Sequence, residues 1–169
     1  MKQLFVLLSL GLSFNCLAQK TDYGQLVKPG EEMQLSFRLV HSAKTVVICK
    51  GANNKYLVYR FGTKDKVELQ YPAQPDTSSW QLFRYRAYSR GGGKENLARG
   101  EYTLEFTNKD VSYKLHEDWN SEDDSFEIGI DVDGENTAQQ LKGDAKTQEG
   151  DMAFIGGDGD QLHNYMGEQ

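Results

Sequence analysis

Short runs in which every second residue is apolar recur along most of this 169-residue chain. The alternation is strict at residues 33–39 and returns at 67–71, 102–106, 111–115 and 126–130. A period of two places every second side chain on the same face of an extended chain, so each run predicts a β-strand with one buried face. No segment has the 3.6-residue apolar spacing of an amphipathic helix.

Turn-forming residues separate these runs at intervals of about 10 to 12 residues, which is typical of antiparallel sandwiches and small barrels. Asn108-Lys109 and Asp133-Gly134 lie where tight hairpin turns are expected. The sequence therefore predicts an all-β fold, an antiparallel β-sandwich or small β-barrel built from hairpins.

Three further segments carry weaker signals. Residues 45–49 form a β-branched run that predicts a strand buried on both faces, with Cys49 as a small buried hydrophobe. Residues 80–88 predict another strand, in which the apolar parity changes between Leu82 and Phe83 and indicates a bulge or burial on both faces. Residues 117–125 are acidic and are expected to be exposed.

Composition divides the chain into four segments. We expect a signal peptide at 1–18, a lead-in segment at 19–32, the antiparallel β domain at 33–142 and a weakly structured C-terminal tail at 143–169. Within that tail, residues 151–155 are the one candidate for a short strand.

The first 18 residues have the pattern of a secretory signal peptide. Their apolar run at 4–12 is shorter than the about 20 residues that a membrane-spanning helix needs, and we expect no transmembrane segment in the mature form. Cleavage after Ala18 would deliver a secreted or periplasmic protein. Lipidation at Cys16 is not expected, because Asn15 stands where a lipobox has a small residue.

Charge and cysteine content exclude several classes of protein. Cleavage would lower the count of Lys and Arg from 19 to 18 against 25 carboxylates, for a net charge of −7. An acidic chain with a pI near 5.1 is not expected to bind nucleic acid through its overall charge. The mature chain would keep Cys49 alone, so we expect no disulfide within it.

No motif for catalysis, a cofactor or a metal stands out. The three histidines lie in no recognisable catalytic motif, and no Gly-x-Ser-x-Gly sequence occurs. Residues 131–142 begin like a calcium loop, but Asn136 and Lys142 occupy the positions that need Gly and Glu. The Gly-Asp repeat at 157–160 offers too few ligands for tight Ca²⁺ binding. We therefore predict no catalytic residue, no cofactor and no metal site.

Between Lys55 and Phe106 the chain carries a series of aromatic and glycine-containing motifs. These are Tyr56-Leu57-Val58-Tyr59-Arg60-Phe61-Gly62-Thr63, Glu68-Leu69, Tyr71-Pro72, Trp80, Phe83, Tyr85 and Tyr88-Ser89-Arg90-Gly91-Gly92-Gly93. With these motifs the stretch resembles a set of uncharacterised secreted bacterial proteins. The resemblance implies a secreted β-rich domain and no site residues.

Arginine and tyrosine gather beside a Gly-rich loop in this acidic chain, and both residue types are favoured at binding hot spots. Arg60, beside Tyr59, adds to the same concentration. The alternative is a solvated sheet face whose arginine stems cover apolar surface. The predicted binding residues are Arg84, Tyr85, Arg86, Tyr88, Ser89, Arg90 and Lys94.

These observations favour a non-enzymatic binding protein whose partner is a protein or an envelope glycan. One form of it is an inhibitor or immunity-type protein, in which Arg90 and Lys94 pair with the two catalytic carboxylates of a glycan hydrolase. One alternative is an envelope glycan-acting enzyme that uses the carboxylates of Glu117-Asp118, residues 122–124 and Asp131/Asp133. A structural envelope protein is the other. The sequence indicates neither the ligand nor the oligomeric state.

Overall fold

The computed structural model describes residues 21–93, 96–153 and 163–164 and confirms the all-β prediction. The 3₁₀ turns η1 (Gly24–Leu26), η2 (Ala52–Asn54) and η3 (Ser79–Leu82) accompany the strands. The strands are β1 (Glu32–Leu39), β2 (Thr45–Lys50), β3 (Leu57–Thr63), β4 (Lys66–Tyr71), β5 (Arg84–Arg90), β6 (Arg99–Asn108), β7 (Val111–Asn120), β8 (Ser125–Gly134), β9 (Thr137–Gly150) and β10 (His163–Asn164).

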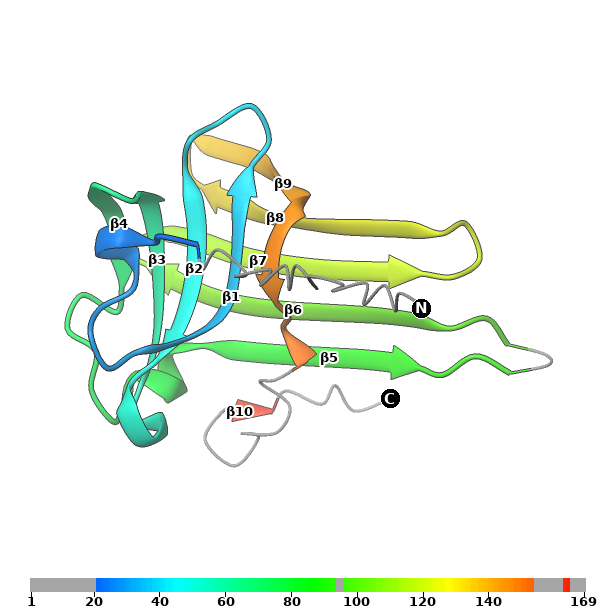
Figure 1. The fold of residues 1–169 in the computed structure, drawn as a ribbon, viewed down its shortest axis with the longest axis horizontal. Helices are drawn as coiled ribbons and strands as arrows, with labels where there is room; N and C mark the ends of the chain where they lie inside the picture. The colour runs from blue at the N-terminus through cyan, green and yellow to red at the C-terminus, as the bar shows by residue number, and fades with distance from the viewer. Residues whose placement is uncertain (1–20, 94–95, 154–162, 165–169) are drawn as a thin grey trace, which may run out of the picture.

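All these strands belong to one sheet in the order β10-β5-β6-β7-β8-β9-β1-β2-β3-β4. Neighbouring strands are antiparallel except for β10, which pairs with β5 in parallel. Strand β9 joins two runs of antiparallel strands, β5–β8 and β1–β4, because its first half pairs with β8 and its second half pairs with β1. The sheet curls into a half-barrel, with β1 and β2 crossing in front of the long strands β5–β8 and with β3 and β4 at their left end (Figure 1).

The core fills the inside of this curl and is rich in aromatic rings. The ring of Phe106 lies 4.5 Å from that of Tyr71, 4.8 Å from that of Tyr113 and 4.9 Å from that of Tyr59, measured between centroids. Such pairs add about 0.5–1.5 kcal/mol each to the stabilisation from burial. The alternating runs at 33–39, 102–106 and 126–130 supply much of the remaining core.

A second, smaller cluster covers the outer face of β2 and β3. Leu26 of η1 packs there with Val47, Cys49 and Val58. The prediction that residues 45–49 are buried on both faces is confirmed, and so is the burial of Cys49, which is 1% exposed. Burial also raises the pKa of its thiol to about 12, so the thiol stays protonated at neutral pH.

The sheet continues past residue 142, where a weakly structured tail was expected. Residues 143–150 form the second half of β9 and pair with Leu35–Leu39 of β1. Gly143 makes this passage possible, since a Cβ there would lie 2.6 Å from Cδ2 of Phe37. Residues 151–153 form no strand, and residues 154–155, also a candidate, lie outside the described part.

Two other expectations need correction. Residues 79–82 form η3 instead of the start of a strand, because the Trp80 indole is buried and donates a 2.9 Å hydrogen bond to the Asn54 carbonyl. This turn explains the change of parity at Phe83. Of the stretch at 117–125 that was expected to be exposed, residues 121–125 are exposed, whereas residues 117–120 belong to β7 and Glu117 is buried. No helix among the described residues is long and apolar enough to cross a membrane.

Candidate functional site

The long strands β5–β8 extend beyond the core, to the right in Figure 1, and end in two hairpins. We call this extension the arm and define it as residues 86–101 and 118–127. Every residue is exposed in two parts of the arm, at 86–90 of β5 and at 121–127 around the β7–β8 turn, so neither part alternates between buried and exposed side chains. The arm therefore gains little from apolar burial, and its strands are held chiefly by pairing with one another.

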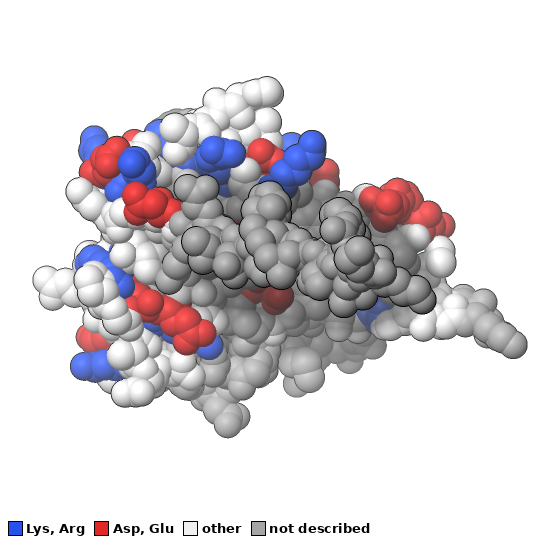
Figure 2. All heavy atoms as spheres, in the orientation of Figure 1, with Lys and Arg blue, Asp and Glu red and all other residues white. Residues whose placement is uncertain are grey.

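Hydrogen bonds join the two hairpins near the end of the arm. The Ser121 N–H and hydroxyl both donate to the Ala98 carbonyl, at 2.9 Å each. The Arg90 guanidinium donates to the Leu97 carbonyl at 3.0 and 3.1 Å, and the Gly93 N–H donates to the Asn96 carbonyl at 2.8 Å. These bonds shape the Gly-rich loop. Carboxylates gather over the neighbouring β7–β8 turn (Figure 2).

Every second residue of β5–β9 points away from the core, and these side chains form what we call the polar face. They line a groove of about 860 Å³. Cross-strand pairing brings them together in rows, because directly opposite residues share a face. The principal charged and aromatic members are Arg86, Tyr88, Arg99, Glu101, Glu105, Lys114, His116, Asp118, Glu127, Asp131 and Lys142.

An acidic row crosses the middle of the polar face. Glu101 lies opposite Asp118, which lies opposite Glu127 on the next strand. Like charges in this arrangement are destabilising. Arg99 pairs with Glu101, and Lys142 lies 3.8 Å from Glu127, so the outer two carboxylates are partly compensated. Partial burial raises the pKa of Asp118, and the charge of Glu127 raises it further.

A cationic group lies at the β5 border of the same face. Arg86 and Arg90 flank Tyr88, and the Arg99 guanidinium lies 5.6 Å from the centre of the Tyr88 ring. The direct neighbours of Arg86 and Arg90 on β6 are Thr103 and Arg99, whereas Arg84 lies opposite Glu105. Arg86 and Arg90 therefore have no carboxylate directly opposite on β6.

The structure brings together four of the seven predicted binding residues. Arg84, Arg86, Tyr88 and Arg90 share the polar face. Ser89 is exposed but has the opposite parity, and Lys94 lies outside the described residues.

Tyr85 does not belong to this surface. It is 3% exposed, and its hydroxyl donates a 2.9 Å hydrogen bond to the Met152 carbonyl. A strand alternates its side chains between two faces, so Tyr85 faces the core when its arginine neighbours face solvent.

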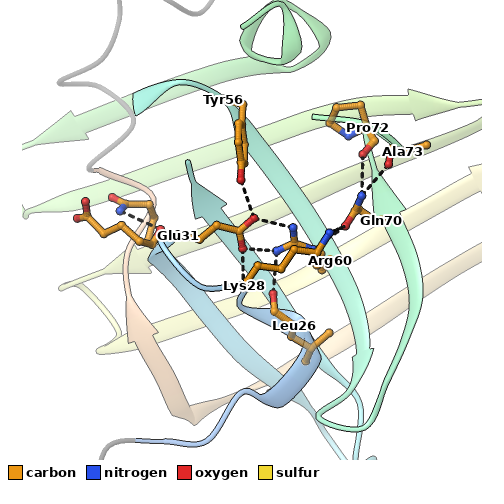
Figure 3. A network of polar contacts seen from close by, with 10 residues as sticks. Leu26, Lys28, Glu31, Tyr56, Arg60, Gln70, Pro72 and Ala73 are labelled. Atoms are coloured by element: carbon orange, nitrogen blue, oxygen red, sulfur yellow. Dashed lines mark hydrogen bonds and ion pairs between the residues drawn. The ribbon is translucent and has the colours of Figure 1, made fainter. Parts of the chain in front are cut away.

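Arg60 is also removed from the candidate surface, because it is fully buried. Its guanidinium forms a bidentate pair with Glu31 at 2.6 and 2.7 Å and donates to the Leu26 carbonyl and Gln70 (Figure 3). The Tyr56 hydroxyl donates to the same carboxylate at 3.0 Å. This network joins the lead-in segment to β3 and β4.

The carboxylates considered for catalysis are separated by the fold. Glu117 points inward, where its carboxylate accepts the Met152 N–H at 2.7 Å, and burial raises its pKa. Asp118 points to the polar face, so the two adjacent residues cannot act as a pair. Residues 122–124 are exposed at the β7–β8 turn. Asp131 lies in the groove, with its Oδ2 3.8 Å from Nδ1 of His116.

Sequence reasoning missed the part of the polar face that β6–β9 contribute, including Arg99, Glu101, Glu127 and Lys142. Its signal was present in the polar positions that alternate with the predicted core. The sequence gives no signal for the strand register that places those positions side by side, because pairing partners are far apart in sequence.

Among the described residues, no group of three or more His, Cys, Asp or Glu side chains is placed to hold a metal ion. Comparison with models of protein families, with curated proteins and with solved structures finds no match. The resemblance to uncharacterised secreted bacterial proteins therefore stays a prediction.

Proposed function

We propose that this protein is a secreted or periplasmic non-enzymatic binding protein that holds its partner on the arm and the polar face. The observation that carries the proposal is the arm itself, whose outward side chains are charged and aromatic and border a groove of about 860 Å³. Strands that extend beyond a core bury little apolar surface of their own. Arg and Tyr, which lie at the β5 border of the arm, are enriched among the residues that dominate binding energy.

The tip of the arm is suited to enter a partner's cleft. Hydrogen bonds from Arg90 and Ser121 hold Leu97 and Ala98, at the β6 end of the loop between β5 and β6, so ordering this part on binding costs less entropy than ordering a free segment. We include in this proposal an inhibitor or immunity-type role, in which Arg90 would pair with a carboxylate of the partner. Proteins and envelope glycans remain the two partner classes.

Charge reversal within the arm tests this proposal. We expect Arg86→Glu to weaken binding by about 2 kcal/mol, roughly thirtyfold, because it introduces a like charge into a surface that selects an acidic partner. The control is Lys66→Glu, which reverses an exposed cation on β4 and should leave affinity unchanged. The mature protein is titrated against partners captured from envelope extract and against a panel of lysozymes, with thermal melts to check folding. Unchanged affinity in folded Arg86→Glu would contradict the proposal.

One observation favours a second candidate, an enzyme acting on envelope glycans. Asp118 has a raised pKa and lies between two further carboxylates, Glu101 and Glu127, as a general acid beside a base would. Release of reducing ends from purified peptidoglycan by the wild type, and its loss in Asp118→Asn, would support this candidate. No release by the folded wild type would rule it out for this substrate.

A further inference from the structure

Strand β5 borders the sheet, and most of its outer edge has no strand beside it among the described residues. Its inner edge pairs with β6 over all seven residues, from Arg84 to Arg90. On the outer edge, the described residues provide only β10, which lies opposite Arg84 and Tyr85 (Figure 1). Among the described residues, no strand pairs with the outer edge from Arg86 to Arg90, and its outward main-chain groups are those that an added strand would use.

This edge is regular enough to receive another strand. The β5–β6 register runs without a shift, and β5 contains no proline, so neither of two common edge protections is present. All five residues from 86 to 90 are exposed. The side chains of Ala87 and Ser89, which face away from the polar face, are small and leave room for larger groups on an added strand. The parallel pairing of β10 uses the first two residues of the same edge.

The charges along the edge determine what kind of strand fits. Arg86 and Arg90 lie on the polar face with Tyr88 between them, and their direct neighbours on β6 are not acidic. The Arg90 guanidinium donates to the Leu97 carbonyl, which is neutral, so this hydrogen bond does not compensate the positive charge of Arg90. An added strand places its own side chains opposite these, so carboxylates at every second position would pair with them.

The same charges argue against a second copy of this chain as the occupant. An antiparallel pair of β5 edges centred on Tyr88 would place Arg86 opposite Arg90 of the copy, and the reverse, so like charges would meet at both ends. Such charges are a common protection against edge-to-edge association.

We propose that the outer edge of β5 from Arg86 to Arg90 binds an extended acidic segment of a partner protein as an additional strand. The proposal rests on the proposed function and specifies its partner as a protein and its mode as strand addition. Main-chain hydrogen bonds would supply affinity that does not depend on sequence, and the arginines would select carboxylates at alternate positions.

The test uses the full mature chain and a synthetic peptide, Glu-Thr-Glu-Val-Glu-Thr-Glu, with both ends blocked. We expect it to bind and to shift the backbone amide resonances of residues 86–90. A matched peptide with Lys in place of Glu should bind at least about tenfold more weakly. The Arg86→Glu/Arg90→Glu variant should reverse this preference. Lys66→Glu, a charge reversal on β4 and outside the polar face, should leave it unchanged.

A third peptide separates strand addition from contact through side chains alone. It keeps the glutamates but carries N-methyl groups in place of every backbone N–H, and it should fail to bind. Equal binding of the methylated and unmethylated peptides would overturn strand addition while leaving the polar face as a binding surface. Failure of the acidic peptide in a protein that still binds an envelope partner through the arm would also overturn it. A concentration-dependent dimer in which the backbone amides of residues 86–90 are protected would show that a second copy is the occupant and refute the acidic-partner proposal.

Discussion

Replacing Glu31 with glutamine should destabilise this fold strongly, because Glu31 compensates a guanidinium that is removed from water. The Arg60 side chain is 0% exposed and that of Glu31 is 1% exposed. Both carboxylate oxygens accept from the guanidinium, at 2.6 and 2.7 Å. Glutamine keeps one acceptor and places an NH₂ group against the other guanidinium nitrogen, so the buried cation loses both its counter-charge and one hydrogen bond.

The expected magnitude follows from this burial. Removing one partner of a buried ion pair costs about 3–5 kcal/mol, against a total stability of about 5–15 kcal/mol for a domain. For a chain of this length each kcal/mol lowers Tm by about 2–4 °C, so a loss of about 6–20 °C is expected. The exposed pair of Lys44 and Glu68, also 2.7 Å apart, is the matched control. Glu68→Gln should cost less than about 1 kcal/mol.

Thermal and urea unfolding at pH 7 and at lower pH would measure this effect. Burial alone would raise the pKa of Glu31, but the Arg60 and Lys28 N–H groups and the Arg60 charge outweigh it and hold the pKa below 4.5. The carboxylate's contribution is therefore complete above pH 4.5 and is lost as the pH falls through the lowered pKa. The difference between wild type and Glu31→Gln should shrink in that range. A Glu31→Gln variant within about 1 kcal/mol of wild type at pH 7 would refute this reasoning.

Two further stability predictions concern the second half of the chain. Burial raises the folded-state pKa of Glu117 above 4.5, so the contribution of Glu117 to the free energy of unfolding should fall as the pH rises from 4.5 through that pKa. Glu117→Gln should flatten the pH dependence of the free energy of unfolding, measured by urea titration. An unchanged pH dependence in this variant would count against the prediction. Gly143→Ala should cost about 1–3 kcal/mol because its Cβ would lie 2.6 Å from Phe37, whereas Gly91→Ala, with nothing within 4 Å, should change stability by under about 0.5 kcal/mol. Equal melting temperatures for the two alanine variants would show that β9 adapts freely at this position.

The sequence was sufficient to predict the strands that alternate between core and solvent. β1, β6, β7 and β8 were predicted because every second side chain enters the core. The second half of β9 was missed because residues 143–150 are mostly polar, and their place in the sheet depends on pairing with β1 and on a glycine that lets Phe37 approach.

The candidate site was predicted only in part, for a related reason. Arg84, Arg86, Tyr88 and Arg90 were found because they are close in sequence. Tyr85 was included with them, although strand alternation turns it inward. Arg60 was expected near the surface because its partner, Glu31, lies 29 residues away and nothing local indicates the pairing. Long-range partners of this kind cannot be read from composition or periodicity.

The central claim is that the arm holds the partner, and hydrogen–deuterium exchange of the free and partner-bound mature protein tests it most directly. We predict that binding slows exchange in residues 86–101 and 118–127, with the largest change between Arg86 and Arg90 and little change in β2–β4. Protection confined to β1–β4, with exchange in the arm unaltered, would contradict the claim.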